Sequence, residues 1–482
     1  MNPAIPTMQQ KLNCVSILYP KSFLLFLLTV IIISSNKLEA QTPVLFLSEA
    51  VKTGLNNYQG IKAKRNYLSA STALVQNTKN QYLPDVIASV QQTYGTVNGQ
   101  FGPAVALGGG LSSSGPTYGN QSWNAAFGGV YLLNTNWEFI SFGRLKSRVD
   151  LAGSQVKLDS ANLLQEQFVH SIRIAGSYLN LLIAQRLVNN AHDNVDRALS
   201  VQQSVLARAK SGLVAGVDSS IANAEVSAAK LALYQAQNNE QQVSNQFAQL
   251  QNIVPAEIPL DTVFFSKLPS AYTTSFAITD NPQVKFYQGR IEQSNSAASY
   301  LKKSIYPGLN LFGTFQSRGS GFDYNYTPDF TDRYTKNYFD GIKPLRYNYL
   351  AGLGIYWNFI SPAKIKQQVK AQQAVSAAYL DEYDLVTTQL KDQLILSDQQ
   401  IANSLKSVQE APLQLKAASD AFLQKSVLYK NGLGNIVDVQ QALYALNRAQ
   451  SDVAVSYINV WQALLLKAAA SGDFDLFIKQ VQ

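Results

Sequence analysis

Very few residues of this chain have a type and spacing that could support chemistry. The two histidines, His170 and His192, are 22 positions apart. On one helix they would be separated by about six turns, so they cannot bind one metal ion together. Gly108–Gly110 is a glycine run without the strand and helix that flank a phosphate-binding loop. With no nucleophile elbow or metal-spaced cluster, we predict no enzyme activity, no cofactor and no metal site.

Two aspartates stand out by position, because each follows a glycine by six residues. Asp218 follows Gly212, and Asp438 follows Gly432. A glycine after a long helix is typical of the left-handed residue that ends it. An aspartate at the start of the next helix stabilises that helix through its charge or by capping. Each pair therefore predicts a sharp turn between two helices.

The elements that position these turns are duplicated. The segment Trp137-Glu-Phe-Ile-Ser recurs as Trp357-Asn-Phe-Ile-Ser, at an offset of 220 residues. The first glycine–aspartate turn recurs as the second at the same offset. Each half is expected to contain a helix, a strand, a loop, a strand, a long helix, a turn and a helix. We assign the first repeat to residues 41–259 and the second to residues 260–482.

The strand pairs are predicted at about 84–139 and about 307–360. Residues Tyr347 to Phe359 alternate between an apolar face and a small, polar face, which is the period of a strand. Segments of this length fit a membrane barrel, although a single such strand would fit a soluble β-sandwich better. Aromatic residues near the strand ends are typical of membrane-interface girdles; they are Trp123, Trp137, Trp357 and Phe359.

The helical hairpins are predicted at about 143–253 and about 363–470. No proline occurs from Gly143 to Lys210, and apolar residues recur there every three or four positions, as in a coiled coil. Such a helix would be roughly 100 Å long. Pro412 is expected to interrupt or kink the second copy.

Four strands in one chain cannot close a barrel, and open edges are not viable in lipid. The barrel must therefore be shared between chains, with 8, 12 or 16 strands for two, three or four copies. The fold class is an α+β membrane protein, in which an oligomeric β-barrel is continuous with a long α-helical barrel.

The first 40 residues read as a signal peptide, with positive charge before a short apolar run. An uncleaved anchor is the alternative, and no other run approaches the length of a membrane helix. Cys14 is the only cysteine and lies before the apolar run, so the mature chain has no disulfide. The net charge is +8, but the basic residues are scattered along the sequence, so they do not predict a nucleic-acid-binding surface.

Nearly the whole mature chain, from about Gln41 to Gly472, resembles the TolC family of outer-membrane efflux proteins. The resemblance rests on the two turns, on the junctions WEFISFGR and WNFISPAK, and on Asn281-Pro282 at the start of the second half. It implies a homotrimer in the outer membrane of a Gram-negative bacterium, with a 12-strand barrel and a 12-helix tunnel through the periplasm. It also implies a passive exit duct for small molecules such as drugs, which opens when a periplasmic adaptor and an inner-membrane pump dock. Metal cations and secreted polypeptides are alternative cargoes.

The resemblance also assigns roles at the periplasmic tip. Three copies of Asp438 would form an acidic ring, and Asp218 takes this role more weakly. Tyr429 matches a tyrosine that lines the constriction, with buried packing as its alternative role. Two positions depart from the family, because Gln441 replaces a second acid and Gly434 replaces a basic residue. The turns themselves contain Gly212, Gly216, Gly432 and Gly434.

A surface protein with a structural or adhesive coiled coil is the competing class. The duplicated strand pairs argue against it, because a stalk needs no barrel strands in mid-chain.

Overall fold

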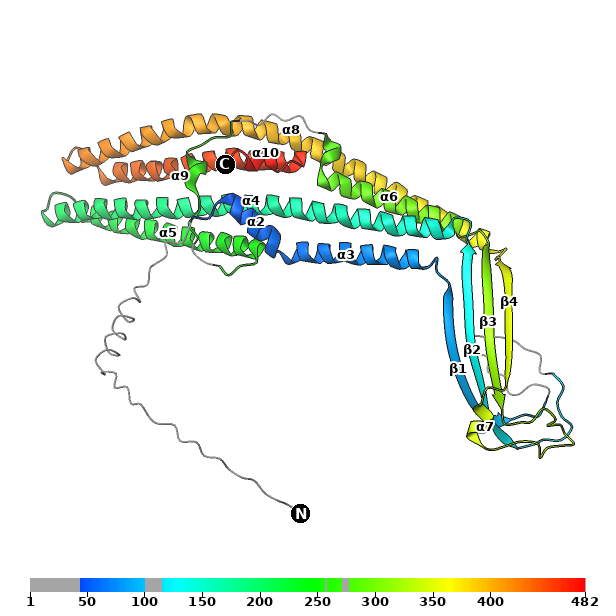
Figure 1. Cartoon of the computed structure of the whole chain (residues 1–482). Coiled ribbons are helices and arrows are strands. Elements are labelled where there is room, and N and C mark those ends of the chain that lie inside the picture. Colours follow the sequence, from blue (N-terminus) through cyan, green and yellow to red (C-terminus); the bar gives the residue numbers. More distant parts are fainter. Residues whose placement is uncertain (1–43, 100–114, 256–257, 271–276, 482) are drawn as a thin grey trace, which may run out of the picture.

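A computed structural model of the chain describes residues 44–99, 115–255, 258–270 and 277–481. The predicted signal peptide, Cys14 and the run Gly108–Gly110 lie outside these residues. Long helices lie side by side along most of the molecule, and a four-stranded sheet extends from one end of them (Figure 1).

The sheet is antiparallel, and its strands are ordered β1-β2-β3-β4 as in the sequence. The predicted four strands are confirmed, and β1 and β4 form its two edges. Their bounds are β1 (Asp85–Thr96), β2 (Ala125–Ile140), β3 (Gly308–Ser320) and β4 (Arg346–Tyr356).

The register sorts the side chains onto two faces, because paired residues on neighbouring strands share a face. One face is polar, and on it the Thr314 hydroxyl donates to the Asn134 side-chain oxygen across 2.8 Å. The other is an apolar face, to which all four strands contribute: Val86, Ala88, Val90, Tyr94, Phe127, Tyr131, Leu133, Trp137, Leu309, Leu311, Phe315, Tyr347, Tyr349, Leu353 and Ile355.

Two aromatic side chains, Phe312 and Tyr356, also lie on the polar face, and the Phe312 ring explains the small residues beside it. Phe312 packs over Gly352 and Gly354 of the neighbouring strand. A Cβ atom added at Gly352 would lie 2.7 Å from the Phe312 ring, so a larger residue there would displace the ring. These glycines therefore hold an aromatic side chain and do not merely make the face polar.

Each strand continues into a helix, and the helices keep the order of the strands. The helices α3, α4, α6 and α8 lie side by side as one layer (Figure 1), and α4–α5 and α8–α9 form two hairpins. Their bounds are α2 (Leu47–Asn57), α3 (Gln59–Asn80), α4 (Arg144–Lys210), α5 (Gly216–Gln251), α6 (Pro282–Lys303), α7 (Tyr338–Ile342), α8 (Ser361–Lys430), α9 (Ile436–Ser471) and α10 (Asp475–Ile478).

The two longest helices are unbroken. α4 has 67 residues and α8 has 70, so each is roughly 100 Å long. Helix α8 continues through Pro412, so this residue does not end the helix. Pro412 removes one backbone hydrogen bond, and its ring lies on the exposed side of the helix. The packing of α8 along α9 holds the remaining turns in place.

The main core lies midway along the helices, where the first described residues, the C-terminal helix α10 and the connection between the repeats meet. Trp461 of α9 and Tyr178 of α4 are fully buried and pack against Phe264. The Tyr178 hydroxyl donates to the Leu45 carbonyl at 2.8 Å and accepts from the Asp261 N–H at 2.9 Å. Burial raises the pKa of Tyr178 to about 12, so the hydroxyl stays protonated and can donate.

Helix α9 corrects the expectation that no further segment approaches a membrane helix. It is long and apolar enough to cross a membrane by length and composition alone. Its apolar side chains instead pack within the helical part, where Trp461, Leu464 and Ala468 are fully buried. Polar residues are dispersed along α9, so its sequence contains no single continuous apolar run.

Candidate functional site

The two turns at the far end of the helical hairpins have the same backbone. Gly212 and Gly432 are left-handed, with φ of 70° and 76°. The next residue donates its N–H back into the preceding helix in both turns, from Leu213 to the Arg208 carbonyl and from Leu433 to the Leu428 carbonyl, each at 2.9 Å. This is the helix-ending motif expected at a C′ glycine.

The helices that follow these turns begin differently. Ala215 precedes α5 and offers no side-chain cap. Asn435 precedes α9, and its side-chain oxygen accepts the Asp438 N–H at 2.8 Å. The capping role considered for Asp438 therefore belongs to Asn435. Asp438 lies in the first turn of α9, where its charge favours the helix N-terminus.

The Asp438 carboxylate is paired within its own hairpin. The Lys425 ammonium of α8 donates to it at 2.8 Å. This hydrogen bond and the charge of Lys425 hold the pKa of Asp438 below its usual range. Gln441, one turn further along α9, is exposed. Within a single chain, the negative charge of Asp438 is therefore balanced by Lys425.

Tyr429 is a buried residue between the two hairpins. Only 3% of it is exposed, and it packs with Val205 and Ala222 of the first hairpin and Ile436 and Val439 of the second. Burial, and next the nearby Asp218 carboxylate, raise the pKa of Tyr429. Packing is therefore its role within one chain.

Arg208 of α4 is a tip residue that the sequence analysis missed. Its guanidinium lies 5.3 Å from the centre of the Tyr429 ring and donates to the Lys430 carbonyl at the end of α8. The family's basic residue is missing at Gly434, and Arg208 contacts the same turn from the other hairpin. Arg208 lies in the last turn of α4, four residues before Gly212, and this position could have identified it as a tip residue.

Two further polar contacts join the hairpins, one close to the tip and one further from it. The Gln440 amide of α9 donates to the Ile221 carbonyl of α5 at 3.2 Å. The Arg197 guanidinium of α4 donates to the Gln450 side chain of α9 at 2.7 Å. The relative position of the two turns is therefore fixed by side chains as well as by packing.

The other end of the helices carries the predicted aromatic residues. The Trp137 ring N–H donates to the Tyr82 carbonyl at 2.7 Å, and the Trp357 ring N–H donates to the Ile305 carbonyl at 3.0 Å. Each tryptophan also packs on the aromatic residue two positions later, Phe139 or Phe359. Both repeats thus fix an aromatic pair where strand meets helix. Trp123 is 82% exposed and precedes β2 at the opposite end of the sheet.

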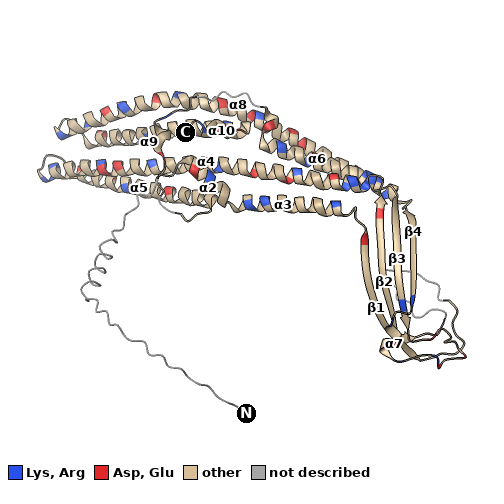
Figure 2. Cartoon of the chain, viewed as in Figure 1, with Lys and Arg blue, Asp and Glu red and all other residues tan. Residues whose placement is uncertain are grey.

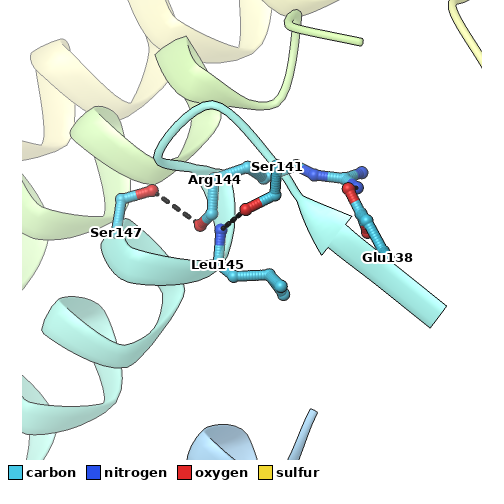
Figure 3. A network of polar contacts seen from close by, with 5 residues as sticks. All are labelled: Glu138, Ser141, Arg144, Leu145 and Ser147. Carbon is cyan, nitrogen blue, oxygen red and sulfur yellow. Dashed lines mark hydrogen bonds and ion pairs between the residues drawn. The ribbon is translucent and has the colours of Figure 1, made fainter. Parts of the chain in front are cut away.

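The first strand-to-helix junction has an uncommon backbone. Phe142 and Gly143 are both left-handed, with φ of 47° and 84°. Figure 3 shows the contacts around them: Ser141 accepts the Leu145 N–H at 3.2 Å, the Ser147 hydroxyl donates to the Arg144 carbonyl, and Arg144 pairs with Glu138. These contacts close the first turn of α4.

The histidines lie apart, as predicted. His170 is fully buried and stacks on Tyr58 with ring centres 3.9 Å apart, and burial lowers the pKa of His170. His192 is exposed and lies 3.4 Å from Asp196. Within the described part of the chain, no three His, Cys, Asp or Glu residues gather where they could hold a metal ion.

Comparison with known proteins finds a family match in the first half of the chain. Residues 51–252 match the family described as outer membrane efflux protein. The matched segment lies within the predicted first repeat and covers less than half of the chain. A comparison with curated protein sequences found no match.

Solved structures share the fold over nearly the whole chain. The outer membrane protein VceC from Vibrio cholerae is 16% identical, with a TM-score of 0.70 over 89% of this chain and 96% of that one. The CmeC outer membrane channel of Campylobacter jejuni is 14% identical, with a TM-score of 0.70 over 88% and 85%. The MtrE outer membrane channel of Neisseria gonorrhoeae, solved in its open state, is 15% identical, with a TM-score of 0.68 over 89% of each chain.

The solved structures that share this fold are proteins or channels of the outer membrane. In the β-barrel of such a protein, an apolar face contacts lipid and a polar face lines the interior. The sheet of this chain likewise has one apolar and one largely polar face.

Proposed function

We propose that the protein is the trimeric exit duct of a tripartite efflux system, through which small molecules pass without energy input from the duct itself. A periplasmic adaptor and an inner-membrane pump would dock at the helical tip. The match of residues 51–252 to the outer membrane efflux protein family and the resemblance of both turns to the TolC family support this proposal.

The observation that carries the proposal is the pair of unpaired sheet edges. β1 and β4 lie at opposite edges of the sheet, and their residues are exposed in a single chain. Tyr349 of β4 is 87% exposed and belongs to the apolar face. Edges that lack partners are not viable in lipid, so β1 of one copy must pair with β4 of the next. Three copies would give a closed barrel of 12 strands.

The tip is the proposed entrance, and Arg208 would hold it narrow. Its contacts with Tyr429 and Lys430 join the two hairpins of each copy. Outward movement of one hairpin would break these contacts and widen the ring of turns. Asp218 and Asp438 would then set the charge of the opening.

Recording from planar bilayers tests the channel and its entrance. The purified oligomer is expected to conduct ions, and Arg208→Gln is expected to raise single-channel conductance several-fold by freeing the hairpins. Arg186→Gln is the matched control, because Arg186 is an exposed arginine on the same helix. A wild-type oligomer that does not conduct would reject the channel, whereas unchanged conductance in Arg208→Gln would reject only the entrance.

The acidic ring needs a separate measurement. Asp438→Asn is expected to lower the preference for cations, which is read from the reversal potential in a salt gradient. An unchanged reversal potential would show that Asp438 acts only on the helix N-terminus and on Lys425.

A further inference from the structure

Basic residues gather at the membrane end of the helices, away from the tip. Figure 2 shows this concentration of Lys and Arg where α3, α4, α6 and α8 meet the strands. We define the basic belt as Lys79, Lys146, Arg148, Lys302, Lys303, Lys364, Lys366 and Lys370.

The charges of the basic belt are not paired within the part of the chain that the structure describes. Among the described residues, none of its members forms an ion pair, and nearly all are exposed. Arg144 lies in the same region but is paired with Glu138. Asp150 is the only carboxylate in the helical turns that carry the belt. Eight like charges gathered in this way indicate an anionic partner outside the chain.

The position of the basic belt along the helices matches one layer of a membrane. Lys146 follows the exposed Phe142 by four residues, Lys302 precedes Tyr306 by four, and Lys366 follows Phe359 by seven. Counted from the helix ends at Arg144, Lys303 and Ser361, these lysines lie only about 2–8 Å into the helices at 1.5 Å per residue. The headgroup layer next to the hydrocarbon core is about 5–8 Å thick on each side. The basic belt therefore begins at headgroup depth.

Part of the basic belt lies on the lipid side of the barrel. Arg144 reaches Glu138, which belongs to the polar face that lines the channel. Lys146 is two residues further along α4, and two residues rotate a helix by about 200°. The Lys146 side chain therefore leaves the helix on the side that continues the apolar face.

We propose that the basic belt binds the anionic headgroups of phospholipids in the membrane leaflet that faces the helices. This inference rests on the outer-membrane location and does not depend on the cargo or the pump. Lipid recognition by a polybasic segment beside a membrane span is electrostatic and weakens with salt. An acidic cell-wall polymer would also meet these charges, but it gives no reason for their confinement to headgroup depth.

Tryptophan quenching by brominated lipids measures this binding, because Trp137 and Trp357 lie beside the basic belt. The full-length oligomer would be placed in vesicles of brominated phosphatidylcholine with increasing brominated phosphatidylglycerol, and Trp123 would be replaced by Phe in every variant. We expect a preference for the anionic lipid of about fivefold or more, which salt reduces. Lys146→Gln/Lys302→Gln/Lys366→Gln should lose most of this preference.

The matched control is Lys391→Gln/Lys406→Gln/Lys416→Gln, which removes three exposed lysines from the middle of α8 and should keep the preference. Equal quenching by the two lipids in the unmodified belt would overturn the proposal. It would also be overturned if the belt variant lost binding to purified cell-wall polymer but kept its lipid preference. Bilayer conductance of the belt variant is expected to stay unchanged, so the outcome does not depend on the channel proposal.

Discussion

The two strand-to-helix junctions occupy equivalent positions in the repeats, yet different backbone conformations and side chains start the helix at each. At the first, Phe142 and Gly143 are left-handed and Arg144 pairs with Glu138. At the second, the equivalent residues are Pro362 and Ala363. There the Asn358 side chain accepts the N–H groups of Ile360 and Ser361, at 3.1 and 3.2 Å.

This difference shows which residues determine the backbone path at each junction. The shared Trp, Phe, Ile and Ser place an aromatic pair at the membrane boundary in both copies. The residues that differ, Glu138 or Asn358 and the dipeptide after the serine, decide how the helix begins. A proline cannot adopt the positive φ of Phe142, so the two junctions cannot share one backbone.

The largest effect is expected when the first residue after the serine is exchanged between the two junctions. Phe142→Pro is expected to cost about 3 kcal/mol or more, because proline fixes φ near −65° whereas Phe142 has φ of 47°. The yield of heat-stable oligomer on semi-native gels should fall sharply. The reciprocal Pro362→Phe should assemble nearly normally; equal damage from both would mean that the backbone difference is unimportant.

A smaller effect is expected at the neighbouring position. Gly143→Ala should destabilise the protein by about 1–2 kcal/mol, since Gly143 is left-handed and alanine is strained there. Ala363→Gly should cost about 1 kcal/mol or less, through helix propensity alone. Thermal unfolding followed by circular dichroism measures both, and a larger loss for Ala363→Gly would contradict the assignment.

The starts of α5 and α9 repeat the comparison at the tip. Asn435→Ala should destabilise the start of α9 by about 1 kcal/mol, because it removes the acceptor for the Asp438 N–H. Ala215→Asn should instead stabilise the start of α5, which lacks a side-chain cap. Hydrogen exchange of the amides in the first turn of each helix measures both changes. Faster exchange in both variants would be inconsistent with capping.

The smallest effect concerns the charge pair at the second turn. Lys425 lowers the pKa of Asp438, so this pair stabilises the tip above the usual aspartate range, and its contribution is lost as pH falls through the lowered pKa. In Lys425→Gln the carboxylate should protonate at a higher pH, and cation preference should decline there first. Reversal potentials across acidic pH measure this shift, with Lys416→Gln as the control. Identical pH profiles would exclude Lys425 as the cause.

The sequence predicted the architecture well because the architecture depends on periodic patterns. The 220-residue repeat, the alternating strands and the glycines of the two turns all have local signals, and the observed strands and hairpins match them. Contacts between distant segments have no such signal. Arg208 on Tyr429, Phe312 over Gly352 and the clustering of Trp461, Tyr178 and Phe264 depend on how the repeats pack. Helix α8 continues through Pro412, and its packing along α9 supports the turns on both sides of this residue.

Closure of the barrel between copies is the central claim, and disulfide cross-linking of the sheet edges tests it most directly. The only native cysteine, Cys14, lies in the predicted signal peptide, so paired cysteines can be introduced along β1 and β4 without interference. Within one chain these strands lie at opposite edges of the sheet. A matched pair, tested in a series such as Ser89→Cys with Leu350→Cys, is expected to yield cross-linked dimers and trimers and nothing larger. Cross-links confined to single chains, or a ladder that continues beyond three copies, would contradict it.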